Sequence, residues 1–240
     1  MCTVTYLPLG KNNFIFTSNR DEDPSREAIA PKKYLENDIA LYYPKDSLAG
    51  GTWIGISEHK RLVCLLNGAF EKHQRAKSYA MSRGKVVKKL LSSVDALEEI
   101  KKINFLNIEP FTIVFVDWKN NLVAHELVWD GNTKHLKKLP NKPQIWSSST
   151  LYNKEMRNQR KAWFSDWLQE QDRLTKVKLL EFHNDKKRGT SETSLQMKRD
   201  KVETVSVTCF TKIKDTVSLE YFDNQNPQKN TLLQLGATFQ

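Results

Sequence analysis

The chain has 240 residues, of which 39% are hydrophobic and 28% charged, with a formal net charge of +10 at pH 7. This length gives one large domain or two small ones ample apolar material for a core. The basic residues occur as dispersed pairs without interleaved aromatic residues, which argues against a nucleic-acid-binding protein. A basic pocket for an anionic small molecule fits the charge better.

The beginning of the sequence shows neither a membrane anchor nor a secretion signal. No apolar stretch approaches the ~20 residues that a membrane-spanning helix needs. A basic start followed by an apolar run and a small-residue cleavage site is also missing. Three cysteines without a CxxC pair suit a reducing compartment, and Cys64 and Cys209 lie in apolar runs typical of core strands. We therefore expect a cytoplasmic protein.

The first third of the chain has the alternation and turn residues of β-strands. A hairpin is expected first, and a loop rich in charge and proline, with Asp23-Pro24 and Pro31, follows it. The strands predicted here cover residues 2–7, 14–18, 40–43, 52–57 and 62–67.

The rest of the chain alternates between helical blocks and strands. Apolar residues recur at helical spacing over residues 78–92, and Asp95 is a suitable N-cap for a second short helix. Further helices are predicted over 154–169 and 174–183, before a polar segment over 184–201 that reads as a mobile excursion. The remaining strands are predicted over 111–118, 122–129, 135–139, 144–148, 202–212 and 216–222, with a short apolar tail around 232–235.

Strands and helices are segregated along the chain, which favours an α+β fold over an alternating parallel sheet. Two antiparallel sheets flanked by helices accommodate this order. We expect a single domain over residues 1–240, and the sequence leaves the oligomeric state open.

Cys2 is the strongest candidate for a catalytic residue. Removal of Met1 would leave its thiol beside a free α-amine, which is a nucleophile with its own base. The polar cluster Ser18-Asn19-Arg20-Asp21-Glu22 follows the second strand of the expected hairpin, which brings it near residue 2. Asn67 ends another strand, and its amide is a suitable donor to a developing oxyanion.

Other motifs carry weaker signals. The segment Gly50–Gly55 allows close backbone approach but lacks the Lys-Ser/Thr ending of a phosphate-binding loop. The five histidines have neither HxH nor HExxH spacing, so no metal site is expected.

Several motifs together resemble the NRDE family, also called the transport and Golgi organisation protein 2 family. The resemblance spans most of the first 90 residues and is carried by Met1-Cys2, Ser18-Asn19-Arg20-Asp21-Glu22, Tyr43-Pro44-Lys45-Asp46, Gly50-Gly51-Thr52-Trp53-Ile54-Gly55, Leu65-Leu66-Asn67-Gly68 and Ser82-Arg83-Gly84. Such proteins are similar to N-terminal-nucleophile (Ntn) hydrolases. The resemblance implies their four-layer αββα sandwich, with two antiparallel sheets flanked by helices.

The resemblance also implies roles for single residues. Cys2 is the expected nucleophile, Asp21 holds its α-amine, and Asn67 binds the oxyanion. The residues expected to contact substrate are Asn19, Arg20, Arg26 and Trp53. The cysteine-type acylases of this group carry an Arg one residue before the Asn-x-Asp element, where this chain has Ser18.

Two functions remain open at this point. The first is an Ntn-type cysteine amidohydrolase or acyl-transfer enzyme for a small amide or thioester, which needs no cofactor. The second is a non-catalytic carrier or trafficking protein on the same fold, with haem or acyl-CoA as the ligand. Cys2 with Asp21 and Asn67 favours catalysis, and the missing Arg favours the carrier.

Overall fold

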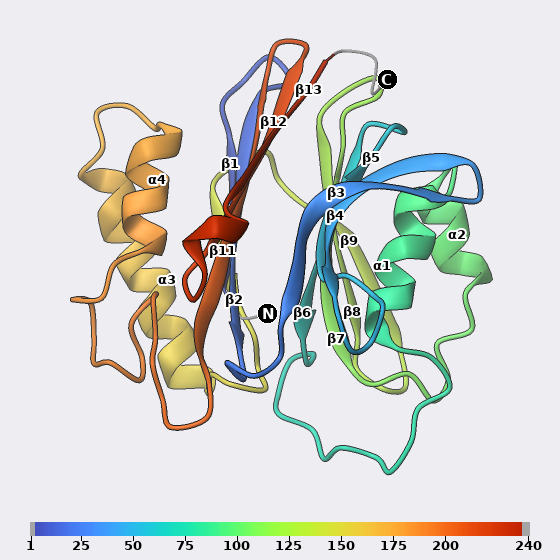
Figure 1. The fold of residues 1–240 in the computed structure, drawn as a ribbon, viewed down its shortest axis with the longest axis horizontal. Helices are drawn as coiled ribbons and strands as arrows, with labels where there is room; N and C mark the ends of the chain where they lie inside the picture. Colours follow the sequence, from blue (N-terminus) through green and yellow to red (C-terminus); the bar gives the residue numbers. More distant parts are fainter. Residues whose placement is uncertain (1–2, 237–240) are drawn as a thin grey trace. The chain divides into compact units, whose positions relative to one another are not determined.

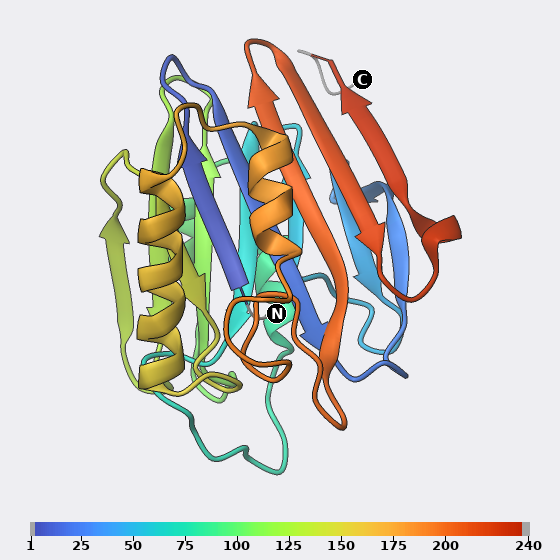
Figure 2. The ribbon, with the colours of Figure 1, turned by 90° about the vertical axis from the view of Figure 1, so that its left-hand side faces the viewer.

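The computed structural model describes residues 3–236. These residues fold into two compact units, one from residues 3–26 and 142–236 and one from Glu27–Asn141. Each unit is an antiparallel sheet that carries two α-helices on one face (Figures 1 and 2). The α+β class predicted from the sequence is therefore confirmed in each unit, whereas the single domain over residues 1–240 stays a prediction.

The first unit is built on a six-stranded sheet in the order β10-β1-β2-β11-β12-β13. Its central pair, β2 and β11, joins the beginning of the chain to its end in antiparallel register. The strands are β1 Thr3–Pro8, β2 Phe14–Glu22, β10 Gln144–Ser147, β11 Glu203–Ile213, β12 Thr216–Asp223 and β13 Thr231–Leu235, with the short 3-10 helix η1 Pro227–Lys229 before β13.

Helices α3 (Lys154–Gln169) and α4 (Lys176–His183) cover one face of this sheet (Figure 2). Each begins at a side chain that accepts a hydrogen bond from the first turn, Asn153 for α3 and Thr175 for α4. The core between helices and sheet contains the buried residues Leu7, Ile15, Ile145, Phe164, Trp167, Leu179, Phe182, Leu195 and Cys209.

The second unit is a seven-stranded sheet in which β3 to β9 follow one another in chain order. Most neighbouring strands are joined by short connections, whereas β6 and β7 are joined by residues 68–110, which contain both helices of the unit. The strands are β3 Ala28–Glu36, β4 Ile39–Asp46, β5 Ile54–Ser57, β6 Arg61–Asn67, β7 Phe111–Asp117, β8 Val123–Trp129 and β9 Lys134–Lys138.

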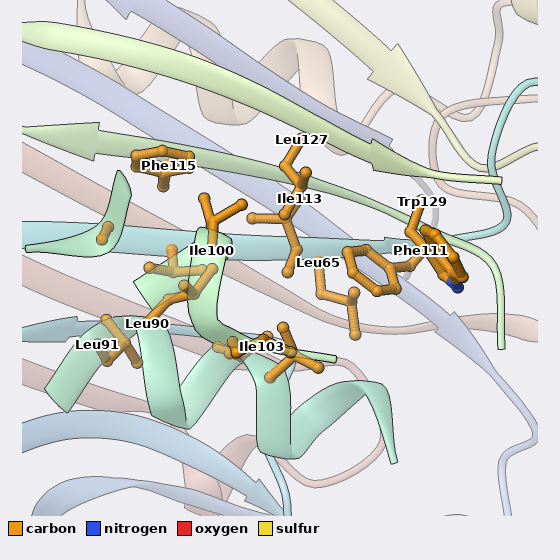
Figure 3. Packing of buried hydrophobic residues seen from close by; sticks show 14 of the residues in the cluster. Leu65, Leu90, Leu91, Ile100, Ile103, Phe111, Ile113, Phe115, Leu127 and Trp129 are labelled. Atoms are coloured by element: carbon orange, nitrogen blue, oxygen red, sulfur yellow. The ribbon is translucent and has the colours of Figure 1, made fainter. Parts of the chain in front are cut away.

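Helices α1 (Arg83–Ser92) and α2 (Ala96–Lys102) pack on one face of this sheet. Figure 3 shows Leu90 and Leu91 of α1 and Ile100 of α2 directed at side chains of the central strands. The strand residues in this core alternate along the chain, as a two-residue period requires. They include Leu65 on β6, Phe111, Ile113 and Phe115 on β7, and Leu127 and Trp129 on β8.

Two glycines allow the first turn of α1 to approach the backbone before β5. A Cβ on Gly84 would lie 3.0 Å from both the N and the O atom of Thr52 and 3.2 Å from the Cα of Gly51. A Cβ on Gly51 would in turn lie 3.1 Å from the Cα of Gly84. The close backbone approach expected for the Gly50–Gly55 segment therefore lets α1 pack against this segment within the unit.

The structure corrects three predicted segments. Ala28–Glu36 is a strand and not a loop, because Pro31 lies on the edge strand at a register shift, where a missing N–H is tolerated. The helix predicted from residue 78 begins at Arg83. The polar segment 184–201 is packed and not a loose excursion, since Leu195 and Met197 are buried within it.

Candidate active site

The polar cluster predicted at a strand end lies inside a strand. β2 continues to Glu22: it pairs with β1 as far as Asn19, which lies opposite Thr3, and with β11 as far as Glu22, with Asp21 opposite Thr204. Asn19, Arg20 and Asp21 are all buried, with at most 3% of each residue exposed. Buried polar groups need hydrogen-bond partners, and the partners of these three side chains define the site.

Asp21 is held by two hydroxyl groups. Tyr152 Oη donates to Oδ2 at 2.7 Å, and Thr204 Oγ1 donates to Oδ1 at 2.6 Å. Thr204 Oγ1 also accepts from the backbone N–H of Met197 at 3.0 Å, so its proton is directed at the carboxylate. The orientation of Asp21 is therefore fixed by Thr204 of β11 and by Tyr152, two residues before α3 begins.

Asn19 ties the sheet to α4. Its Nδ2 donates to the carbonyl oxygens of His183 at 2.9 Å and Leu195 at 2.8 Å, which directs Oδ1 at the His183 ring. His183 Nδ1 then donates to Oδ1 at 2.6 Å, and Nε2 accepts from Thr5 Oγ1 at 2.7 Å. Burial lowers the pKa of His183 to about 3, and the positive charge of Arg160 adds to this effect. These bonds give Asn19 a structural role, and its contact with substrate stays a prediction.

Arg20 points to the other face of the sheet, because side chains alternate along a strand. Its Nη1 donates to the carbonyl oxygen of Arg26 at 3.0 Å. Arg26 is more exposed and forms an ion pair with Glu22 at 3.7 Å. Substrate binding by Arg20 and Arg26 stays a prediction.

The sheet face that carries Arg20 is polar at this end. Ser206 lies opposite Arg20, Thr208 lies opposite Ser18, and Tyr221 lies opposite Thr208 on the next strand. All of them are buried, and burial raises the pKa of Tyr221 to about 12. This face therefore offers hydroxyl groups and one guanidinium on the side away from α3 and α4.

Asn67 and Trp53 belong to the second unit. Asn67 is the last residue of β6 and is half-buried. The turn after it is anchored, since Gly68 N–H donates to Pro110 O at 3.1 Å and Thr112 Oγ1 donates to Gly68 O at 3.0 Å. Trp53 is buried, and its carbonyl oxygen accepts from Leu65 N–H at 2.8 Å.

The structure thus places Asn19, Arg20, Asp21 and Arg26 in the first unit, and Trp53 and Asn67 in the second. Cys2 lies outside the described residues. The predicted convergence of Cys2, Asp21 and Asn67 on one crevice stays a prediction.

The described chain shows four side chains around Asp21 and Asn19 that the sequence did not indicate: Tyr152, Arg160, His183 and Thr204. Arg160 is buried on α3 and contacts Thr3. Each of them lies more than 130 positions from its partner, as with Tyr152 and Asp21, so no local pattern signals the contact.

Two features are absent from residues 3–236, a candidate metal site and a candidate membrane span. Within that range no group of three or more His, Cys, Asp or Glu side chains could hold a metal ion. Over the same residues, no helix has the length and apolar character for crossing a membrane. The predicted cytoplasmic location stays a prediction.

The fold is that of the Ntn hydrolases. Conjugated bile acid hydrolase from Clostridium perfringens matches with a TM-score of 0.56 and 12% identity, covering 98% of this chain and 92% of the other. The Caenorhabditis elegans ortholog of N-acylethanolamine-hydrolyzing acid amidase matches with a TM-score of 0.60 and 12% identity, covering 87% and 92%. At this identity the similarity establishes the fold alone, and it confirms the predicted fold class.

The chain belongs to the Transport and Golgi organisation 2 family, whose model matches residues 1–229. The Bos taurus Transport and Golgi organization protein 2 homolog is 32% identical over 113 residues, which cover 43% of this chain and 40% of the relative. The match therefore spans less than half the length of this curated relative. The family predicted from the motifs is confirmed.

Proposed function

We propose that this chain is an Ntn-type cysteine amidohydrolase or acyl-transfer enzyme for a small amide or thioester. The observation that carries the proposal is the orientation of Asp21, a buried carboxylate with two hydroxyl donors on the strand next to β1. Cys2 is covalently joined to Thr3, which pairs with Asn19, two residues from Asp21. Asp21 is thus available to hold the α-amine of a chain that begins at Cys2.

The proposed reaction begins with transfer of the Cys2 Sγ proton to the α-amine. The thiolate then forms a bond to the substrate carbonyl carbon, and the carbonyl electron pair moves to the oxygen, which Asn67 stabilises. Collapse of this intermediate breaks the C–N or C–S bond, and the leaving group takes the proton from the amine. Water, deprotonated by the amine, then cleaves the thioester and frees Cys2.

The polar face of the first sheet supports a substrate with an anionic or polar group. Arg20 supplies a guanidinium there, and Ser206 and Thr208 supply hydroxyl groups. Arg26 and Trp53 are further candidates for substrate contact.

The test is a screen of small amides and thioesters with a chromogenic or fluorogenic leaving group. We expect turnover by the wild-type protein and none by Cys2→Ala, with Cys209→Ala as a control that keeps activity, because the Cys209 thiol is buried in the core. Equal turnover by wild type and Cys2→Ala would contradict the proposal.

A carrier for haem or acyl-CoA is the second candidate. The observation in its favour is Ser18, which is buried between Val4 and Thr208 at the position where the acylases carry an arginine. If the protein is a carrier, we expect it to bind haemin or acyl-CoA saturably, and we expect Arg20→Ala to weaken this binding. Binding without any turnover in the screen would favour the carrier over the enzyme.

A further inference from the structure

Of the four strands that end the two sheets in residues 3–236, three have features that oppose pairing with another chain. The backbone N–H and C=O groups of a sheet edge are protected in natural proteins by lysine, proline, short strands or a covering helix. β3 contains Pro31, Lys32 and Lys33 and has a register shift. β9 has the sequence Lys-His-Leu-Lys-Lys. β10 has only four residues, directly follows Pro143, and packs against α3.

β13 is the fourth edge strand, and it has none of these features. Its five residues, Thr-Leu-Leu-Gln-Leu, include neither a charge nor a proline. One side of β13 pairs with β12, from Thr231 opposite Tyr221 to Leu235 opposite Val217, and no strand within residues 3–236 pairs with the other side. Figure 2 shows β12 and β13 beyond the part of the sheet that α3 and α4 cover. β13 is therefore a neutral edge without a covering helix of its own unit.

Two side chains of β13 are exposed on the face of the sheet that carries α4. Leu232 lies opposite Glu220 of β12, and Glu220 forms an ion pair with Lys176 of α4 at 2.6 Å. Leu232 is 59% exposed, and Gln234, two residues further on the same face, is exposed as well. The nearest carboxylate is thus already paired with a lysine. A strand added beside β13 would meet an apolar and a neutral polar side chain here and would remove Leu232 from water.

The sequence of β13 is compatible with pairing to itself. Two copies of an edge strand that pair antiparallel about a two-fold axis bring each residue opposite the residue at the mirrored position. A register centred on Leu233 places Leu232 opposite Gln234 of the second copy. No like charges meet in this arrangement, and the row of backbone groups on each edge finds hydrogen-bond partners on the other.

The same operation is unfavourable for the other long edges. For β9, a register centred on Leu136 would place Lys134 opposite Lys138 of the second copy, and like charges directly opposite each other destabilise a sheet. The lysines and the register shift of β3 disfavour regular self-pairing there too. Charge therefore distinguishes β13 as the edge that a second copy can use.

We propose that two copies of this chain associate through β13, which pairs with β13 of the second copy and joins the two six-stranded sheets into one continuous sheet. This inference is independent of the proposed function. A five-residue edge buries less surface than a standard protein interface, so the dimer is weak and depends on protein concentration.

The first experiment is sedimentation velocity of the 240-residue chain over a range of concentrations, with amide hydrogen exchange measured by mass spectrometry at both ends of that range. We expect the average mass to rise from that of the 27.9 kDa monomer toward that of a dimer. Where about nine-tenths of the chains are dimeric, the outward-facing amides of residues 231–235 should exchange roughly tenfold more slowly than after dilution, because they exchange from the monomer. Peptides from β9 should exchange equally at both concentrations.

The second experiment places lysine on the proposed interface. The double variant Leu232→Lys, Gln234→Lys brings like charges opposite each other in the same register, and both positions are exposed, so the fold tolerates the change. We expect its dimer dissociation constant to rise by roughly 30-fold. Leu35→Lys is the matched control, because Leu35 is a 69% exposed leucine on the edge strand β3, and this variant should dimerise like the wild type.

Three results would overturn the proposal. The first is a wild-type chain that stays monomeric up to its solubility limit. The second is a dimer whose β13 amides exchange as fast as in the monomer or that the folded double variant leaves intact, since such a dimer uses another surface. The third is protection of β13 that requires a different protein, which would assign the edge to a foreign strand. If the double variant does not fold, hydrogen exchange of the wild type decides alone.

Discussion

The buried histidine of the first unit makes the stability of the protein depend on pH. Burial lowers the pKa of His183 from 6.5 to about 3, so the unfolded chain binds a proton between these values that the folded protein excludes. The stabilisation is complete above pH 6.5 and is lost as the pH falls toward 3, by about 1.4 kcal/mol per pH unit within that window. Between pH 7 and pH 5 the loss from this one group is about 2 kcal/mol.

The measurement is the free energy of unfolding in urea at pH 7, 6 and 5 for the wild type and His183→Gln. The variant loses the imidazole that bridges Thr5 and Asn19, so we expect it to be less stable at pH 7. Its stability should then fall by about 2 kcal/mol less than that of the wild type between pH 7 and pH 5. Carboxylates and His125, whose pKa is also lowered by burial, are present in both proteins and cancel in the difference. Equal pH slopes for the two proteins would refute the reasoning.

Three further substitutions test the packing and the site by urea denaturation at pH 7. Gly84→Ala should lower the free energy of unfolding by about 1–3 kcal/mol, because the added Cβ would crowd the backbone of Thr52. Helix propensity alone favours Ala by about 1 kcal/mol, so a gain in stability would contradict the close approach. Asp95→Ala should cost about 1 kcal/mol through loss of the α2 N-cap, and no change would show that the cap does not stabilise the helix. Tyr152→Phe should cost about 1–3 kcal/mol, because a buried carboxylate oxygen of Asp21 loses its donor, and a neutral result would argue against that hydrogen bond.

The sequence predicts the regular elements well where periodicity is strong. The helix expected over 154–169 has the observed bounds, and the Asp95 side chain caps α2, the short helix predicted after it. The hairpin of β7 and β8 is likewise found within one residue at each end. These elements are specified by local patterns, which a single sequence carries in full.

The predictions failed where tertiary contacts override local signals. Pro31 is typical of a strand breaker, but the edge of the sheet and a register shift between Ile29 and Lys32 accommodate it. The polar residues after Ser18 predict the end of β2, yet the strand continues because β11 pairs with it as far as Glu22 and β1 as far as Asn19. Side chains far away in the sequence form hydrogen bonds with the buried polar groups of β2. No local sequence pattern predicts these bonds.

The candidate site, too, could be predicted from the sequence only in part. The motif around Asp21 singles out β2 in the sequence, since its polar composition is unusual after an apolar run. The burial of Arg160 could not be predicted from the sequence, because an arginine in a charged helix is typical of the surface. The fold shows that it is buried and contacts Thr3. Contacts between distant segments require the three-dimensional structure.

The central claim is that the chain acts through a nucleophile at Cys2, and mass spectrometry of the purified protein tests it most directly. The account predicts an intact mass without Met1, and a single alkylation near neutral pH that maps to Cys2 while the buried Cys64 and Cys209 stay unmodified. A mature protein that retains Met1, or a Cys2 no more reactive than an ordinary thiol, would contradict it.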